Sequence, residues 1–165
     1  MEIAIDISID PGTSATGVCV WRAGRVHHLE TLRPGEGCIE FVEKAFSISR
    51  QFRDLCLTLS DSNQTIRYVA IEDFERYNRS DKKAGNVNAK VGMIKCATVR
   101  GLLLGVADCF ADEVKLISKG QISKEQTAML CRSWGLKGSK DAFDAVQIGV
   151  CAGMDRRRLY DNEGM

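Results

Sequence analysis

The 165-residue chain has little of what marks secreted, membrane-bound or disordered proteins. It contains only two prolines and no low-complexity stretch, which argues against extensive disorder. No apolar run approaches the roughly 18 residues that a membrane-spanning helix needs, so we expect no membrane contact. The first residues carry acidic side chains and no basic region, so we expect no signal peptide and a cytoplasmic protein.

Cysteine and histidine are present, but not in a metal-binding pattern. The seven cysteines are an odd number, the closest two are 13 residues apart, and no Cys-x-x-Cys pair occurs, which weakens a zinc interpretation. Several cysteines occupy apolar positions of periodic segments, and we expect reduced, buried thiols. The only histidines, His27 and His28, alternate faces of a predicted strand and cannot easily share one ion.

The net charge of +1 hides an asymmetry along the chain. Residues 1–75 contain 7 Lys/Arg and 12 Asp/Glu, a balance of −5, whereas residues 76–165 contain 16 and 10, a balance of +6. Residues 76–100 contain seven basic residues and a single acid, Asp81. A basic region beside an acidic one suits a polyanionic partner with a separate carboxylate site, although a solvated charged surface has the same composition.

Hydrophobic periodicity predicts an α/β fold. Strict alternation and short apolar runs indicate three strands joined in hairpins, at 2–10, 17–21 and 25–32. Helices and strands then alternate, with helices over 39–60, 89–109, 123–135 and 140–154 and strands over 66–74 and 114–117. The polar residues 75–88 have no period and are expected to form a loop.

This order of elements predicts a mixed five-stranded sheet flanked by helices. The first three strands are expected to be antiparallel and the last two parallel, because helical crossovers join parallel strands. No internal repeat or second domain is evident. We therefore expect residues 1–165 to form one domain, with a polar tail from about residue 156.

Four acidic residues occupy positions suited to a metal site. Asp10 ends the first strand and Glu72 lies near the end of the fourth, so parallel neighbouring strands would bring both to one edge, where ligand sites of open α/β sheets lie. Asp141 and Asp144 share one face at the start of the last helix. Clustered carboxylates repel unless a cation compensates, and oxygen-only ligands select hard ions such as Mg²⁺ or Mn²⁺. Two such ions roughly 4 Å apart catalyse phosphodiester cleavage.

Each acid also has an ordinary interpretation when taken alone. Asp141 suits a helix N-terminus, Glu72 the exposed end of a strand, and Asp10 a Pro-Gly turn. Only their combined placement favours a site. Asp6, on the same strand face as Asp10, is a weaker candidate, and Asp73 points away from Glu72 by strand alternation.

Three segments resemble the RuvC family of Holliday-junction resolvases. They are Ile-Asp-Pro-Gly-Thr-Ser-Ala-Thr-Gly at 9–17, Ala-Ile-Glu at 70–72, and Asp-Ala-Phe-Asp-Ala at 141–145. The resemblance implies an RNase H-like fold and a homodimeric, Mg²⁺-dependent endonuclease that resolves four-way DNA junctions by paired nicks. It implies two ions, for which Mn²⁺ substitutes, and carries over as catalytic metal ligands the same four acids: Asp10, Glu72, Asp141 and Asp144.

The chain departs from the family between its last strand and last helix. The stretch 118–124 is shorter than the corresponding stretch of the bacterial family, which suggests a phage or otherwise divergent member. We therefore expect it to act in a bacterial cell or a phage-infected host. Lys119 and Lys124 are both candidates for the family's active-site lysine and for phosphate contact. The sequence does not choose between them.

Basic and aromatic side chains follow Glu72 closely. The family places an aromatic residue shortly after the second acid, where it stacks at the opened junction, and both Phe74 and Tyr77 are candidates. Phe74 equally suits the core and Tyr77 a loop surface. The expected phosphate contacts in this segment are Arg76, Arg79, Lys82 and Lys83.

The helix predicted at 89–109 is apolar around most of its circumference. This pattern predicts burial on two sides, against the sheet and against a second copy of the chain, with Gly101 and Gly105 permitting close approach. A helix enclosed within one subunit explains the same pattern. A two-fold dimer would supply two equivalent sites for the two cuts that a junction needs.

Three other functions compete with junction resolution. Another RNase H-like nuclease, acting on flaps, other branched DNA or RNA–DNA hybrids, would have the same metal site. A non-catalytic junction-binding protein has no reason to keep four acids in this arrangement. An actin-like ATPase or kinase shares the Asp-x-Gly turn at 10–17, but needs a second glycine-rich phosphate motif and a far longer chain.

Overall fold

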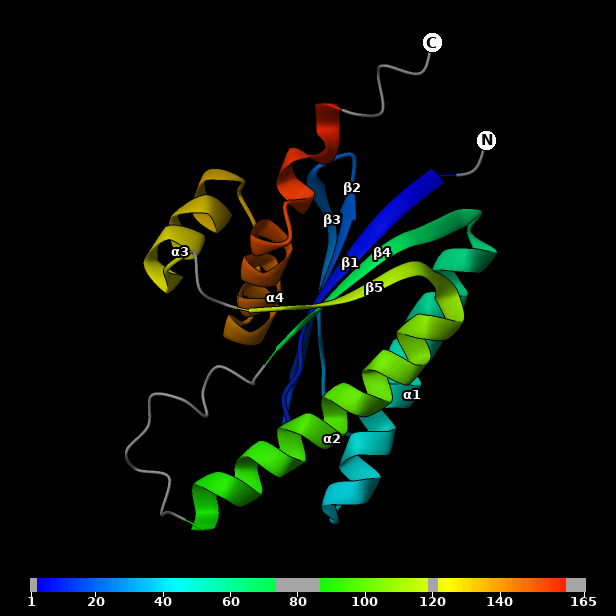
Figure 1. Cartoon of the computed structure of the whole chain (residues 1–165), viewed down its shortest axis with the longest axis vertical. Coiled ribbons are helices and arrows are strands. Elements are labelled where there is room, and N and C mark those ends of the chain that lie inside the picture. The colour runs from blue at the N-terminus through cyan, green and yellow to red at the C-terminus, as the bar shows by residue number, and fades with distance from the viewer. Residues whose placement is uncertain (1–2, 74–86, 119–121, 160–165) are drawn as a thin grey trace.

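The chain folds into a five-stranded sheet with helices on both faces (Figure 1). The computed structural model describes residues 3–73, 87–118 and 122–159. Its elements, in chain order, are β1 (Ile3–Asp10), β2 (Thr16–Arg22), β3 (Arg25–Leu32), α1 (Phe41–Asp61), β4 (Gln64–Glu72), α2 (Val87–Phe110), β5 (Ala111–Ile117), α3 (Lys124–Ser133), α4 (Lys140–Cys151) and the 3-10 helix η2 (Met154–Leu159).

The sheet has the predicted mixture of strand directions. Its strand order is β3-β2-β1-β4-β5. β2 pairs antiparallel with both β1 and β3, whereas β4 pairs parallel with both β1 and β5. The predicted α/β class and the split between antiparallel and parallel strands are therefore confirmed.

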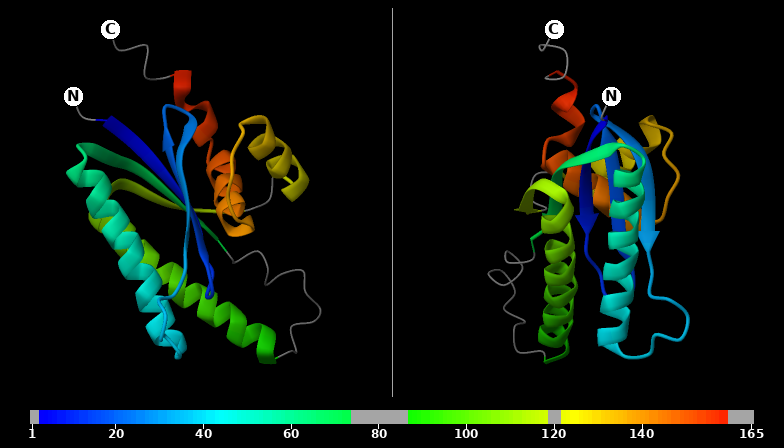
Figure 2. Two further views of the ribbon diagram at one scale, coloured as in Figure 1. Left: turned by 180° about the vertical axis from the view of Figure 1, so that it is seen from behind. Right: turned by 90° about the vertical axis from the view of Figure 1, so that its right-hand side faces the viewer.

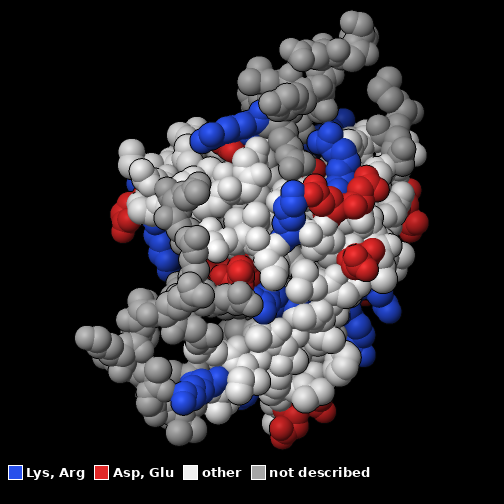
Figure 3. All heavy atoms as spheres, viewed as in Figure 1, with Lys and Arg blue, Asp and Glu red and all other residues white. Residues whose placement is uncertain are grey.

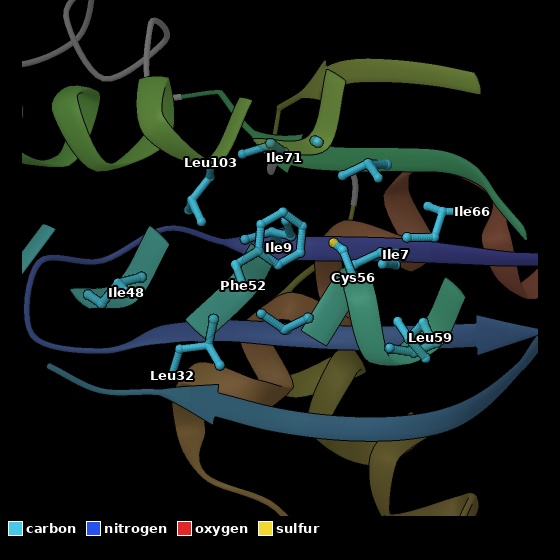
Figure 4. Packing of buried hydrophobic residues seen from close by; sticks show 14 of the residues in the cluster. Ile7, Ile9, Leu32, Ile48, Phe52, Cys56, Leu59, Ile66, Ile71 and Leu103 are labelled. Atoms are coloured by element: carbon cyan, nitrogen blue, oxygen red, sulfur yellow. The ribbon is translucent and has the colours of Figure 1, made fainter. Parts of the chain in front are cut away.

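Two helical layers sandwich the sheet. α1 and α2 pack side by side on one face, and α4 covers the other face with α3 beside it (Figures 1 and 2). The alternation of β1 points its isoleucines at the first layer, where Ile7 and Ile9 meet Phe52 of α1 and Leu103 of α2 (Figure 4). Burial of each such side chain contributes roughly 1.5–3 kcal/mol. Because this layer holds the larger of the two clusters of buried residues, it is the main core of the molecule.

The second layer is joined to the sheet by a buried polar relay. The indole Nε1–H of Trp21 donates to Ser8 Oγ at 2.8 Å, and Ser8 Oγ–H donates to the carbonyl oxygen of Ala145 at 2.7 Å. A Cβ atom at Gly149 would overlap the indole of Trp21, so the glycine lets α4 lie directly on β2. This relay sets the height and rotation of α4 over β1 and β2.

Several predicted boundaries differ from the structure by up to three residues. β4 ends at Glu72 rather than 74, and the N–H of Asp73 closes it by donating to Ile117. β5 starts at residue 111, directly after α2. η2 continues to residue 159, past the point near 156 where the polar tail is predicted to begin, and it starts at the fully buried Met154. The extent of the polar tail stays a prediction.

The expectation of buried thiols was correct for only part of the cysteines. All seven cysteines are free, and Cys19, Cys56 and Cys131 are buried. Burial raises the pKa of Cys19 and Cys131, and raises that of Cys56 to about 12. Cys109 is exposed on the last turn of α2, and the other three are half-buried.

The described helices include none that is long and apolar enough to cross a lipid bilayer. The predicted loop at 75–88 falls outside the described residues, except that Val87 and Asn88 already belong to α2.

Candidate active site

Asp10 and Glu72 end two neighbouring parallel strands at the same edge of the sheet. β1 and β4 run in register up to the pair Ile9 and Ile71, so the next residue on each strand is one of the two acids. Ile9 and Ile71 face α1 and α2, and alternation therefore directs both acids to the face covered by α4. Glu72 is only 3 % exposed, and Asp10 is half-buried.

A glycine brings the first turn of α4 over this edge. Gly17 on β2 is the strand partner of Asp10, and Thr31 on β3 is the strand partner of Gly17. A Cβ atom at position 17 would overlap the backbone oxygen of Asp141, so only glycine lets the helix come this close. Asp141 therefore starts α4 beside the strand end that carries Asp10.

Hydrogen bonds at the start of α4 hold this approach. Ser139 caps the helix by accepting from the N–H of Ala142 at 3.2 Å. The hydroxyl groups of Ser139 and Thr31 lie 2.5 Å apart and tie the cap to β3. Asp144 follows Asp141 by one turn, beside the Ala145 that is bonded to Ser8, and both aspartates are half-buried.

The four acids share one edge, but their side chains do not form a tight cluster. Within residues 3–73, 87–118 and 122–159, no three His, Cys, Asp or Glu side chains gather closely enough to hold one metal ion. The donor set at this edge is nevertheless oxygen only, which fits a hard divalent cation, and closer approach of these like charges would require a compensating cation. Metal ligation by the four acids stays a prediction.

Two side chains of α2 lie beside the candidate site, and the sequence did not indicate their position there. Arg100 binds Asp73 through Nη1 and Oδ1 at 2.9 Å, which holds α2 against the end of β4. One turn earlier, Cys96 is half-buried within electrostatic reach of both strand-end acids. Burial raises the pKa of the Cys96 thiol, and the negative charges of Glu72 and Asp10 raise it further. The apolar pattern of residues 89–109 did not indicate that Cys96 lies near the two acids.

Asp6 lies away from the candidate site. Its carboxylate is buried four residues before Asp10, and its Oδ2 is 3.6 Å from Nη2 of Arg67 on the neighbouring strand β4. The pairing of β1 with β4 shifts at this point, between Ile5 and Asp6. Asp6 therefore belongs to an ion pair of the fold rather than to the edge where the other acids lie.

Arg33 is a basic residue at the site that sequence reasoning missed. It directly follows β3, and its Nη2 lies 3.9 Å from Oδ2 of Asp141. The signal that would have found it is the antiparallel pairing of β3 with β2, which ends β3 at the edge where Gly17 begins β2.

The remaining predicted residues are placed only in part. Lys124 is exposed in the first turn of α3. Two residues earlier, the carbonyl oxygen of Ile122 accepts a hydrogen bond from the side chain of Gln147 on α4. Gln147 lies about two helical turns after Asp141. His27 and His28 are both exposed, which agrees with a surface role. The predicted residues outside the described ranges are Phe74, Arg76, Tyr77, Arg79, Lys82, Lys83 and Lys119.

Comparison with known proteins finds relatives by structure alone. No family model and no curated protein matches the chain. The chain is similar to a structure of RuvC from T. thermophilus in complex with a Holliday junction substrate, with a TM-score of 0.67 and 20 % identity over 93 % of this chain and 94 % of that chain. A second structure of Thermus thermophilus RuvC gives a TM-score of 0.61 and 19 % identity over 93 % and 95 %.

A third structure, the yeast mitochondrial Holliday junction resolvase Ydc2, matches with a TM-score of 0.49 and 10 % identity over 99 % of this chain and 87 % of that chain, and we draw no argument from it. At the identities of the two Thermus structures, similarity establishes the fold. The resemblance to RuvC that the three motifs indicated is confirmed at this level, and the chain has the RNase H-like fold of RuvC.

Proposed function

We propose that the chain is a structure-selective endodeoxyribonuclease that resolves four-way DNA junctions by paired, metal-dependent nicks. The observation that carries the proposal is the shared sheet edge, where the register of β1 and β4 and the contact of Gly17 with α4 bring the acids near one another. The RuvC fold supports the proposal, as does the Thermus structure that contains a Holliday junction substrate.

Asp10, Glu72, Asp141 and Asp144 would hold two Mg²⁺ ions, with Mn²⁺ able to substitute. When bound, such ions activate a water molecule and stabilise the leaving oxygen in phosphodiester hydrolysis. The chain itself contributes orientation. Burial restricts the rotamers of Glu72, and the bonded hydroxyl groups of Ser139 and Thr31 keep the start of α4 against β3.

Recognition of the junction is proposed for residues that follow the strand ends in sequence. Ile117 is the strand partner of Glu72, so β5 also ends at the site, and Lys119 comes two residues later. We propose phosphate contacts for Lys119, Lys124, Arg76, Arg79, Lys82 and Lys83. Phe74 and Tyr77 are the candidates for stacking on an unpaired base, a contact that contributes about 1–3 kcal/mol.

We further propose that two copies associate through the outward face of α2. Val99, Leu103 and Ala107 are buried against the sheet and α1, whereas Val91 and Ile94 are exposed. Gly101 and Gly105 also face open space, and the middle of α2 presents a largely uncharged surface (Figure 3). An exposed apolar strip with two glycines four residues apart suits close packing against the same strip of a second copy.

Cleavage of matched substrates by the purified protein in Mg²⁺ tests the proposal. A four-way junction, a flap, a linear duplex and an RNA–DNA hybrid should be compared, and we expect paired nicks in the junction at a rate well above the others. Phe74→Ala and Tyr77→Ala should lower junction cleavage more than flap cleavage, because only an opened junction needs the stacked aromatic. Preference for flaps or hybrids would replace the proposal by another RNase H-like nuclease, and absence of any cleavage would contradict both.

We infer that residues 1–165 act as one nuclease domain in the cytoplasm of a bacterial or phage-infected cell. All four candidate acids lie on the single sheet or on the helix that covers it, which supports one functional unit.

A further inference from the structure

Arg33 presents an exposed guanidinium beside the candidate active site. Its Nη2 is 3.9 Å from Oδ2 of Asp141, and the side chains of Arg33 and Asp141 are 61 % and 35 % exposed. Hydrogen bonds between such groups are about 2.7–2.9 Å long, so this is an electrostatic contact in reach of solvent rather than a fixed bond. The guanidinium is therefore free to turn toward another anion.

The backbone of Arg33, by contrast, is held from two sides. Gln51 of α1 donates through Nε2 to the carbonyl oxygen of Arg33 at 2.6 Å. Two residues earlier, Thr31 is bonded to Ser139 at the start of α4. The base of the side chain is thus fixed between two helices, while its charged end stays exposed at the edge of the site.

The positive charge of Arg33 offsets the repulsion between the carboxylates of the site and a DNA phosphate. A DNA phosphate that approaches four acids is repelled, and a cation at the rim offsets that repulsion. A planar guanidinium also matches the oxygen atoms of a phosphate through two parallel donors. Arg33 follows β3, which lies on the other side of β1 from β4, so it would hold the DNA from the β3 side of the site.

We propose that Arg33 binds a backbone phosphate of DNA on the β3 side of the candidate active site, exchanging the carboxylate of Asp141 for the phosphate. This inference rests on the proposed function, because it assumes that the chain's polyanionic substrate is DNA. Arg33 acts as a binding residue that places the strand, and its contact carries no base or junction specificity.

Salt dependence of DNA binding tests the inference. Dissociation constants for a four-way junction and a linear duplex should be measured in EDTA at salt concentrations from about 50 to about 200 mM, for the wild type, Arg33→Gln and Arg33→Lys. Arg53→Gln is the matched control, because Arg53 is 53 % exposed and paired with Asp54 at 3.2 Å on the outer side of α1. The loss of one phosphate contact should lower the log–log salt slope by about 0.9.

We expect Arg33→Gln to bind both DNAs several-fold more weakly with this lower slope, Arg33→Lys to keep the slope, and Arg53→Gln to behave as the wild type. Wild-type affinity and slope in Arg33→Gln would overturn the inference. An equal loss of DNA affinity in Arg53→Gln would overturn the inference as well. So would a loss of affinity in both Arg33→Gln and Arg33→Lys that is accompanied by a lower melting temperature, because this result indicates a structural role for Arg33.

The two proposals fail in different ways. A wild type that cleaves junctions while Arg33→Gln binds normally leaves the proposed function standing without the phosphate contact. A wild type that cleaves nothing but binds DNA through Arg33 leaves the contact standing without the proposed function. A wild type that binds no DNA overturns both.

Discussion

At the scale of single residues, glycines shape the candidate site as much as acids do. Gly17 and Gly149 both allow α4 to lie on β2, at the two ends of the helix. Without them the same acids would be present, but Asp141 would be displaced from the strand end of Asp10. A site argued only from titratable residues therefore leaves out the positions that bring them together.

Gly17→Ala should disturb the site because its methyl group overlaps the backbone of Asp141. Overpacking of this kind costs about 1–3 kcal/mol, and we expect a corresponding fall in the free energy of unfolding together with loss of junction cleavage. Gly92→Ala is the control, because Gly92 is exposed on α2 with no atom near its Cβ position. Urea unfolding should find that control unchanged or up to about 1 kcal/mol more stable. A fully active, equally stable Gly17→Ala would show that α4 is seated differently.

Neutral replacements of the strand-end acids should separate cleavage from binding. Glu72→Gln and Asp10→Asn remove a charge with little change of shape, so we expect nicking of a junction in Mg²⁺ to fall at least 100-fold, the order expected when a positioned catalytic group is lost. Binding measured in EDTA should be retained or strengthened, because one repulsion with phosphate is gone. Asp54→Asn, at an exposed position of α1, should leave both unchanged. Near-normal nicking by either variant would contradict the assignment.

At the scale of elements, α2 has one buried and one exposed apolar face. Its inner face packs on α1 and the sheet through Leu103, and its Arg100 holds the end of β4. Its outer face is apolar and exposed, which a helix serving only its own subunit would not need. The even distribution of apolar residues along 89–109 thus combines one buried stripe with one exposed stripe.

Ile94→Glu should convert a dimer into a monomer without unfolding the chain. Ile94 is 66 % exposed, so a charge there meets water in the monomer but would be buried between two copies. Sedimentation equilibrium at micromolar concentration should give about 36 kDa for the wild type, twice the 18.2 kDa chain, and half of that for the variant. Met129→Glu is the matched control, because Met129 on α3 is 63 % exposed. A wild type that is monomeric both alone and on a junction would exclude the interface.

At the scale of the whole molecule, buried thiols link stability to pH. Burial raises the pKa of Cys56 to about 12 from an ordinary value of 9.0, so above pH 9 the thiol ionises in the unfolded chain before it does so in the folded one. The stability that this thiol contributes is present below pH 9 and is lost as pH rises toward 12, by up to about 1.4 kcal/mol per pH unit.

Cys56→Ala should therefore flatten the decline of the unfolding free energy between pH 9 and 10.5, although it lowers stability at pH 7 by leaving a small cavity. Urea unfolding at several pH values checks this, with Cys109→Ala as the control, because Cys109 is exposed. An equal pH slope in Cys56→Ala and the wild type would show that the thiol is not protected by burial.

The sequence by itself determined the elements and the likeness to RuvC. The alternation of Ile3, Ile5, Ile7 and Ile9 and the capping box that starts at Ser123 depend on neighbours within a few residues, so they can be read directly from the chain. The placement of Asp10 and Glu72 at one edge also followed, because parallel strands end together.

Only the tertiary structure decided which atoms meet across that edge. Gly17 and Arg33 both contact Asp141, and Cys96 lies near Asp10, across more than 80 residues of sequence in each case. Such contacts depend on strand register, on the height of α4 over β2 and on where α2 crosses the end of β4. No local pattern encodes these distances, because they arise from the packing of whole layers against one another.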